Sequence, residues 1–178
     1  MQNLCYNVSM LEIYYSYAEI KSDDFIRHVL ARYYNMPNAA LHKSLNGKPY
    51  VENAKFQFNL THSKGLIALG VGKKQLGLDC ESLSGKARPA VLNKFSERER
   101  AEISTVSDFY AHWTARESYI KYLGETLADC WRRVEYVGGK IWFRGKLTEA
   151  VITQFELDNY VFSVCGEYTK INLKKIDV

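Results

Sequence analysis

The chain has 178 residues, of which 47% are hydrophobic, 25% are charged and 3 are proline. This composition excludes an intrinsically disordered chain, and the length suits one large domain or two small lobes that pack closely together. The formal net charge of +4 at neutral pH favours an anionic partner without specifying which one.

The N-terminal part predicts a strand followed by helices. Residues 10–20 are rich in β-branched and aromatic residues, which favours an opening strand. Ser22 stands before two acidic residues at a predicted helix start, and apolar residues recur at helical spacing through residues 24–34. Pro37 is placed to open a second, short helix.

From residue 56 the pattern changes to short apolar runs separated by turn residues. Such runs predict a meander of three strands, at residues 56–60, 65–72 and 75–81.

Helices are expected again in the middle of the chain. Residues 88–95 have a helical pattern, and Ser96 and Glu99 have the spacing of a capping box. Ser107 is placed to cap a longer helix that ends near Gly124.

The last part returns to strands with tight turns, at residues 134–143 with a Gly-Gly turn, and at 150–157 and 160–168 joined by Asp158-Asn159. The whole order predicts an α+β fold. We interpret it as two similar lobes, each a small antiparallel sheet with packed helices, related by a pseudo-two-fold axis. The predicted N-terminal lobe covers residues 1–74 and the C-terminal lobe covers residues 75–178.

Cysteine usage and hydropathy predict a cytoplasmic protein. The four cysteines are too far apart in sequence for a Cys-x-x-Cys motif, which favours reduced thiols. No apolar run approaches the ~18 residues of a membrane span, and the N-terminus lacks a signal-peptide pattern.

Two acids end an apolar strand in the sequence GLDCE. Asp79 and Glu81 are two residues apart, so their side chains share one face of the strand while Cys80 points to the other. Paired acids repel each other unless a cation lies between them, and Mg²⁺ uses one or two carboxylates together with substrate phosphates. The alternative is a solvated strand end.

A third acid lies on the apolar side of the long helix. Phe109, Trp113 and Ile120 form an apolar stripe at ~100° per residue, and Glu117 lies between the last two. A salt bridge to Lys121 is one interpretation. If the helix packs on the strand that carries the other two acids, Glu117 instead completes a three-carboxylate cation site, and Lys121 reaches anions bound to it.

Two turns carry further candidates. His62 is expected in a tight turn between Thr61 and Ser63, where the hydroxyls, the imidazole and Lys64 could bind a phosphate. Lys48 lies in another turn. Taken alone, each is better explained by ordinary turn chemistry.

Taken in order, these segments resemble the 4′-phosphopantetheinyl transferase family. The matching segments are GKP (47–49), FNLTHS (58–63), GLDCE (77–81), FSERE (95–99) and WTARESYIKYLG (113–124). The last follows the family pattern W-[S/T]-x-K-E-x-x-x-K-x-x-G with one change. The chain looks like the longer, pseudo-two-fold monomeric class.

The resemblance implies an enzyme with its active site between the lobes. In this family a serine of an acyl or peptidyl carrier protein attacks the β-phosphorus of coenzyme A, takes the 4′-phosphopantetheine arm and releases 3′,5′-ADP. By resemblance, Asp79, Glu81 and Glu117 hold Mg²⁺ as the cofactor.

The resemblance also assigns the polar residues around the metal. Lys121 contacts the pyrophosphate, and Lys48, Thr61 and His62 contact coenzyme A near the adenosine and its phosphates. The base that deprotonates the serine is either Glu117 or a metal-bound water or hydroxide.

Three features depart from the family. Arg116 replaces a lysine, and Cys80 replaces an aliphatic residue or a third ligand. A basic N-terminal residue for the adenosine 3′-phosphate has no match, and Lys21, Arg27 and Arg32 are open candidates for that contact.

Two other functions compete with the transferase. One is a non-catalytic module that holds coenzyme A or a carrier protein. The other is a basic nucleic-acid-binding domain, which is disfavoured because acids and bases alternate freely at residues 86–100. The sequence does not specify the carrier protein, its pathway or a preference for acylated coenzyme A.

Overall fold

The computed structural model describes residues 9–86 and 89–178. The helices are α1 (Ser22–Tyr34), α2 (Pro89–Leu92), α3 (Glu97–Glu102), α4 (Val106–Leu123) and α5 (Leu127–Cys130), with a 3₁₀ turn η1 (Trp131–Arg133). The strands are β1 (Met10–Ser16), β2 (Leu41–Lys43), β3 (Pro49–Val51), β4 (Gln57–Ser63), β5 (Leu66–Gly72), β6 (Gly77–Ser82), β7 (Val134–Val137), β8 (Lys140–Phe143), β9 (Lys146–Leu147), β10 (Ile152–Leu157), β11 (Tyr160–Cys165) and β12 (Lys170–Lys175).

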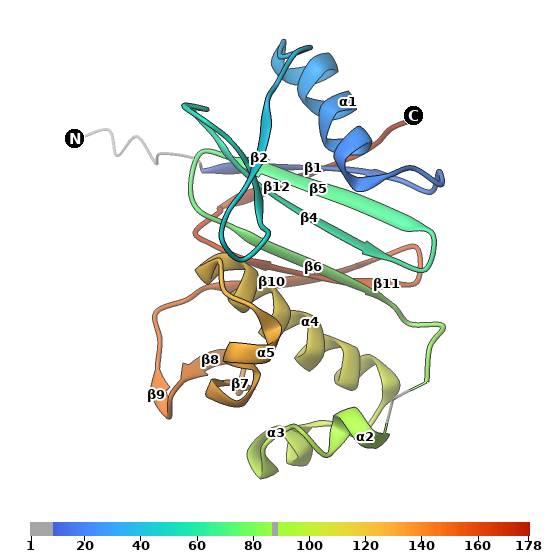
Figure 1. Cartoon of the computed structure of the whole chain (residues 1–178). Coiled ribbons are helices and arrows are strands. Elements are labelled where there is room, and N and C mark those ends of the chain that lie inside the picture. The colour runs from blue at the N-terminus through green and yellow to red at the C-terminus, as the bar shows by residue number, and fades with distance from the viewer. Residues whose placement is uncertain (1–8, 87–88) are drawn as a thin grey trace, which may run out of the picture.

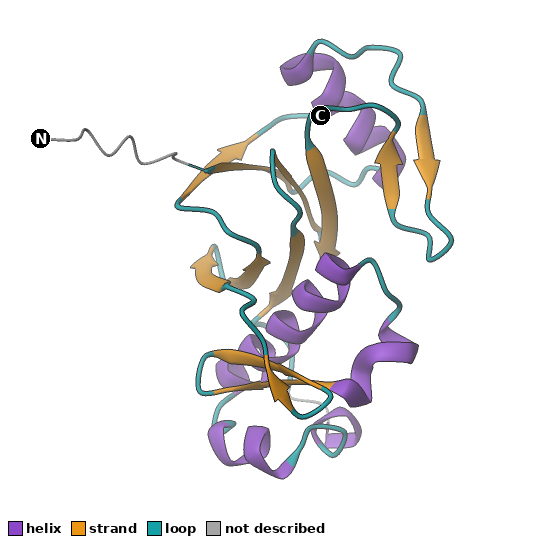
Figure 2. Ribbon diagram, turned by 90° about the vertical axis from the view of Figure 1, so that its left-hand side faces the viewer, coloured by secondary structure: helices purple, strands orange, loops and turns teal. Residues whose placement is uncertain are grey.

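Two sheets pack between two helices. Helix α1 covers a four-stranded sheet with the order β12-β1-β5-β4, and α4 packs on a three-stranded sheet with the order β10-β11-β6 (Figure 1). In the side view, α1 and the β2–β3 hairpin lie at one end of the molecule and α4 lies toward the other (Figure 2). The predicted α+β class, with small antiparallel sheets and few helices, is confirmed.

Apolar side chains fill the space between these layers. Leu11, Leu78 and Phe162 come from both sheets and belong to one buried cluster, which joins the sheets face to face. Phe25 and Leu30 belong to a second cluster beneath α1. All seven residues of β5 are buried, which explains why its sequence reads as a continuous apolar run rather than an alternating one.

The predicted three-strand meander is only partly correct. β4 and β5 pair as antiparallel neighbours, but β6 leaves them and pairs with β11 in the other sheet. β12 was not expected at all. It runs parallel to β1, so the end of the chain returns to the N-terminal sheet. The division at residue 74 and the pseudo-two-fold relation stay predictions.

Several local predictions can be compared directly. The capping box of Ser96 and Glu99 is present at the start of α3. The cap of α4 is Thr105 rather than Ser107, because Thr105 accepts from the backbone of Asp108 while the Asp108 carboxylate accepts in return. Pro37 opens no helix and lies in a turn.

Helix boundaries also shift in the N-terminal and middle regions. α1 begins at Ser22 itself, with Lys21 in the capping position. The helix expected over residues 88–95 is the single turn α2, and residue 88 lies outside the described residues.

Of the cysteines in the described residues, Cys80, Cys130 and Cys165 are free and buried. Within the same residues, no helix is long and apolar enough to cross a membrane.

Candidate active site

One cavity of about 470 Å³ brings the predicted site residues together. It is bounded by the starts of α1 and β3, the polar side of β4, the end of β6 and the last turns of α4. All seven predicted residues line it, namely Lys48, Thr61, His62, Asp79, Glu81, Glu117 and Lys121. Four of the five sequence motifs therefore meet at this cavity, and FSERE lines a different one.

Asp79 lies at the centre of this cavity and is 4% exposed. Its Oδ1 accepts from the ammonium of Lys121 at 2.6 Å and from the hydroxyl of Thr61 at 3.1 Å. Its Oδ2 is buried and has no hydrogen-bond partner in the structure. A buried carboxylate oxygen without a donor is costly, so Oδ2 marks a position where a ligand would stabilise the site.

α4 holds the third acid against this strand. Phe109 and Ile120 of the predicted stripe are buried, whereas Trp113 is half-buried and lines a different cavity. The backbone of Gly77 at the start of β6 touches the helix so closely that a β-carbon there would lie 1.8 Å from the carbonyl oxygen of Ser118. Because no side chain separates strand from helix, Glu117 shares the cavity with the acids of β6.

Burial perturbs both Glu117 and Asp79 in this cavity, and it raises the pKa of each. Burial, followed by the negative charges of Asp79 and Glu81, raises the pKa of Glu117 to about 8, and Lys121 opposes this rise only in part. No described residue makes a hydrogen bond or ion pair with its carboxyl group. A bound cation would remove the repulsion that keeps Glu117 protonated.

The two lysines of the cavity have opposite shifts. Burial disfavours the charged form of Lys121, but Asp79 and Glu117 outweigh it and raise the pKa of its ammonium. Burial and the neighbouring Lys121 lower the pKa of Lys48. Lys121 pairs with Asp79 and not with Glu117, so the salt bridge within the helix is not formed.

Lys48 ties the N-terminal turn to the end of α4. Its ammonium donates to the carbonyl oxygens of Lys121 at 2.8 Å and Leu76 at 3.3 Å. Nearby, the Asn46 amide donates to the carbonyl oxygen of Gly124 at 2.9 Å. The carbonyls of Lys121 and Gly124 lie at the end of α4, where a helix leaves them free, and all three bonds hold the GKP turn over the cavity.

His62 differs from its predicted placement. It lies within β4 rather than in the turn, which begins at Lys64, and its side chain is exposed at the cavity. Of the three basic residues considered for the 3′-phosphate, Lys21 lines an adjoining cavity that His62 also lines. Arg27 donates to the carbonyl oxygen of Ala39, and neither Arg27 nor Arg32 lines the cavity.

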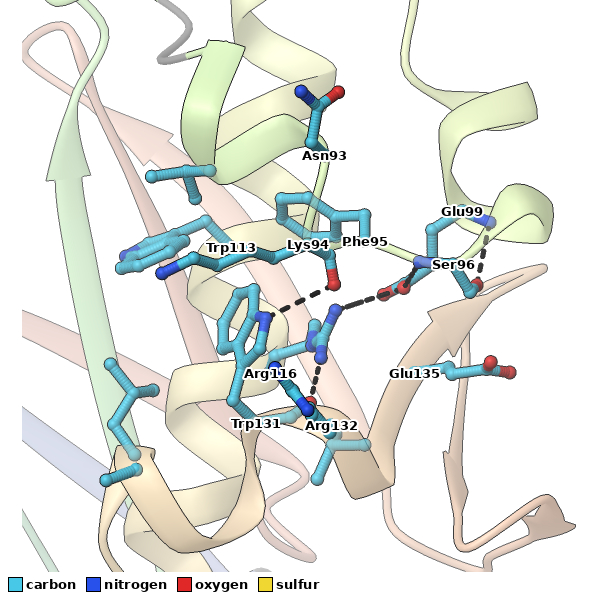
Figure 3. Close-up of a pocket in the computed structure, with 14 residues that line it drawn as sticks. Asn93, Lys94, Phe95, Ser96, Glu99, Trp113, Arg116, Trp131, Arg132 and Glu135 are labelled. Carbon is cyan, nitrogen blue, oxygen red and sulfur yellow. Dashed lines mark hydrogen bonds and ion pairs between the residues drawn. The ribbon is translucent and has the colours of Figure 1, made fainter.

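Arg116, where the chain departs from the family pattern, faces a different cavity (Figure 3). Its guanidinium lies 3.6 Å from the ring centre of Trp131 and pairs with Glu99 at 3.0 Å. Glu99 also accepts from the backbone N–H groups of Ser96 and Tyr136, so it joins α3, α4 and β7. Burial lowers the pKa of Arg116 to about 10, and Glu99 opposes this. Arg116 therefore has a packing role on the other side of the helix.

Sequence reasoning missed the connection between β4 and β6. Asn59, Thr61 and Ser63 are all buried at alternating positions of β4, where a strand facing a core normally carries apolar residues. That alternation of polar residues was a readable signal. It indicated that this face of β4 meets polar groups rather than a hydrophobic core.

The residues of the cavity fit a hard cation, although no formed metal site is present. Among residues 9–86 and 89–178, no three acidic, histidine or cysteine side chains are already arranged to hold a metal ion. The unpartnered Oδ2 of Asp79 and the raised pKa of Glu117 are both relieved by positive charge. Oxygen ligands of this kind suit Mg²⁺, and magnesium binding stays a prediction.

Comparison with known families decides the class of the protein. A model of the 4′-phosphopantetheinyl transferase superfamily matches residues 75–165. The chain belongs to this superfamily. The matched segment contains the acids Asp79, Glu81 and Glu117 together with Lys121. The expectation of an enzyme of the phosphopantetheinyl transferase family is confirmed.

Curated relatives agree with this membership. The 4′-phosphopantetheinyl transferase gsp of Aneurinibacillus migulanus is 27% identical over 179 residues, covering 92% of this chain and 75% of that protein. The 4′-phosphopantetheinyl transferase of Bacillus subtilis is 28% identical over 115 residues, covering 60% of this chain and 51% of that protein. The mouse L-aminoadipate-semialdehyde dehydrogenase-phosphopantetheinyl transferase is 27% identical over 134 residues, covering 62% of this chain and 43% of that protein. This phosphopantetheinyl transferase thus spans about half or less of the latter two.

Proposed function

We propose that the protein transfers the 4′-phosphopantetheine arm of coenzyme A to a serine of an acyl or peptidyl carrier protein and releases 3′,5′-ADP. One observation carries this proposal. The seven predicted site residues come from four of the five matching segments, and all seven line one cavity. Family membership indicates a phosphopantetheinyl transfer reaction, and the cavity is the site where we propose that it occurs.

Magnesium dependence is part of the proposal. Asp79, Glu81 and Glu117 would hold Mg²⁺, supported by the unpartnered Oδ2 and by the repulsion among the acids. When bound, the metal supplies positive charge that offsets the charge of the pyrophosphate. A protonated Glu117 must release its proton for this role.

The chain's own cations complete the binding of coenzyme A. Lys121 directs its ammonium into the cavity and would bind the pyrophosphate, where its charge stabilises the leaving 3′,5′-ADP. Lys48 and His62 lie on the side of the cavity formed by β3 and β4 and would contact the adenosine phosphates. Thr61 lines the cavity too, but its hydroxyl proton is donated to Asp79.

Glu117 is our candidate for the group that accepts the serine proton. Burial raises its pKa to about 8 in the metal-free protein, and nearby positive charge would lower that pKa and supply the ionised carboxylate that a general base needs. We further propose that the protein acts as a monomer, with its two lobes related by a pseudo-two-fold axis.

Mass spectrometry of a carrier protein tests the reaction. Incubation with the wild-type protein, coenzyme A and Mg²⁺ should add the phosphopantetheine mass to the carrier, and Asp79→Ala or Glu117→Gln should abolish this addition. A panel of fatty-acid, polyketide and peptide-synthetase carriers identifies the substrate. Coenzyme A binding without mass addition to any carrier would favour the alternative, a non-catalytic binding module.

A further inference from the structure

Side chains rather than backbone groups connect β4 to β6. The backbone N–H groups of β6 that point away from β11 donate to side-chain oxygens of β4. The three bonds join Leu78 to Asn59 at 2.7 Å, Cys80 to Thr61 at 3.1 Å and Ser82 to Ser63 at 3.2 Å. The donor lies 19 residues after the acceptor in every pair. These N–H groups at the edge of β6 therefore have hydrogen-bond acceptors, although β6 forms no backbone ladder with β4.

Two of these three side chains make a second bond. The Thr61 hydroxyl donates to Oδ1 of Asp79 at 3.1 Å, and the Ser63 hydroxyl donates to Oε2 of Glu81 at 2.6 Å. Each hydroxyl thus accepts from the backbone of β6 and donates to an acid of β6. A hydroxyl has one proton, and once it accepts the backbone N–H that proton is free for the carboxylate; at Thr61 the more distant Cys80 Sγ, at 3.6 Å, is a weaker acceptor than the carboxylate.

This arrangement fixes the acids before any ligand arrives. Each hydroxyl is buried and is anchored at its lone pair by a backbone N–H group of β6. An anchored donor holds the carboxylate in one orientation, and it leaves Oδ2 of Asp79 without a partner. Groups that orient ligands in this way change metal affinity without touching the metal.

We propose that Thr61 and Ser63 are positioning residues that orient Asp79 and Glu81 for a divalent cation. The proposal rests on the magnesium site of the proposed function. It assigns Ser63 a role in the site, and it gives Thr61 a task that does not require contact with coenzyme A. The chemical basis is the orientation of two carboxylates by two backbone-anchored hydroxyls.

Asn59 provides a matched control. Its side-chain oxygen accepts from the backbone of β6 exactly as the hydroxyls do, but the structure records no bond from Asn59 to an acid. Replacement of Asn59 therefore removes one connection between the strands and leaves both acids with their donors. If the three side chains only connect the strands, replacing any of them should change Mg²⁺ affinity equally. If Thr61 and Ser63 position the acids, replacing either should weaken Mg²⁺ binding, and replacing Asn59 should not.

The experiment measures Mg²⁺ affinity by calorimetry in the absence of coenzyme A, together with the Mg²⁺ concentration for half-maximal loading of a carrier. Ser63→Ala and Thr61→Val should weaken Mg²⁺ binding by about 10- to 100-fold. Asn59→Ala should keep wild-type Mg²⁺ affinity even though it lowers the melting temperature. Ser63→Thr and Thr61→Ser keep the hydroxyl and should restore affinity.

Equal Mg²⁺ affinity in the wild type, Ser63→Ala and Thr61→Val would overturn the proposal, as would an equal loss in Asn59→Ala. If Asn59→Ala does not fold, Asn59→Ser serves as the control. A wild-type protein that binds Mg²⁺ but loads no carrier would refute the proposed function and leave the positioning role standing. A wild-type protein that binds no Mg²⁺ would refute the positioning role.

Discussion

Lys121 and Asp79 form an ion pair across the interface between α4 and β6, with the ammonium nitrogen 2.6 Å from Oδ1. The carbonyl oxygen of Leu78 accepts from the same ammonium at 3.1 Å. Two groups of β6 thus hold the ammonium of Lys121 at the cavity that Lys121 and Asp79 line. A pyrophosphate entering this cavity meets an ammonium that is already positioned, which is the condition for electrostatic catalysis.

Replacing Lys121 should reduce turnover, and it should also lower stability because Asp79 is left buried without its cation. Lys121→Met removes the cation that offsets charge on the leaving group, and we expect kcat for carrier loading to fall by about 10²- to 10³-fold. Steady-state loading assays with the folded variant measure this effect. Lys74→Met, which removes an exposed ion pair with Glu167, is the control and should leave kcat unchanged. Wild-type kcat in Lys121→Met would contradict the assigned role.

Stability should depend on pH through Glu117. Its folded-state pKa of about 8 lies above its ordinary value of 4.5, so the folded protein binds this proton more tightly than the unfolded chain does. The resulting stability is present below about pH 4.5 and is lost as the pH rises through about 8. In the absence of divalent metal, Glu117→Gln should therefore be more stable than the wild type at alkaline pH.

Urea unfolding at about pH 5, 7 and 9 in the presence of a chelator measures this difference. Glu125→Gln removes an exposed carboxylate at the rim of the same cavity and should follow the wild-type pH dependence. An identical pH dependence in the wild type and Glu117→Gln would show that the carboxyl group of Glu117 is not destabilised by its surroundings.

Metal binding should release a proton. Because Glu117 is mostly protonated at neutral pH in the free protein, Mg²⁺ must displace that proton to use the carboxylate. We expect Mg²⁺ binding to release protons near pH 7 and to release fewer as the pH rises above about 8, and the raised pKa of buried Asp79 makes that carboxyl group a second source. Calorimetry in buffers of different ionisation enthalpy counts the protons. Proton release that persists in Glu117→Gln would assign it to another group.

Arg116 should matter for stability rather than for substrate binding. Arg116→Met leaves Glu99 buried without its cation, which we expect to cost about 3–5 kcal/mol in the free energy of unfolding. Arg116→Lys restores the family residue and keeps the charge, but it loses the planar contact with Trp131, so its cost should be smaller. Chemical denaturation gives both values, and the KM for coenzyme A should stay unchanged in the folded Arg116→Lys variant.

Local sequence signals predicted several turns and helix starts of the fold because they act between neighbouring residues. The Ser96–Glu99 capping box and the φ values of 46° at Asp158 and 65° at Asn159 follow from hydrogen bonding and turn chemistry among neighbours. The convergence of Asp79 and Glu117 was inferred because an acid within an apolar stripe needs a compensating partner. That inference depended on charge rather than on topology.

Long-range pairings were harder to predict because they are encoded by packing. Nothing local distinguishes β6 as a partner of β11 rather than of β5, since all three strands are apolar and short. The parallel addition of β12 to β1 joins residues about 160 apart and leaves no turn signal. The polar alternation at Asn59, Thr61 and Ser63 was visible, but its meaning required knowing which strand lay beside it.

The contact between Gly77 and Ser118 has a consequence for how variable the site can be. Strand and helix meet there backbone to backbone, with a β-carbon at Gly77 also placed only 2.5 Å from the backbone nitrogen of Tyr122. Where side chains pack together, a change of rotamer can absorb a substitution. At Gly77 the neighbouring atoms belong to the backbone of α4, so the distance between β6 and α4 cannot adjust in this way. The width of the gap that the acids span is thus set by the absence of a single methyl group, and even alanine at position 77 would force strand and helix apart.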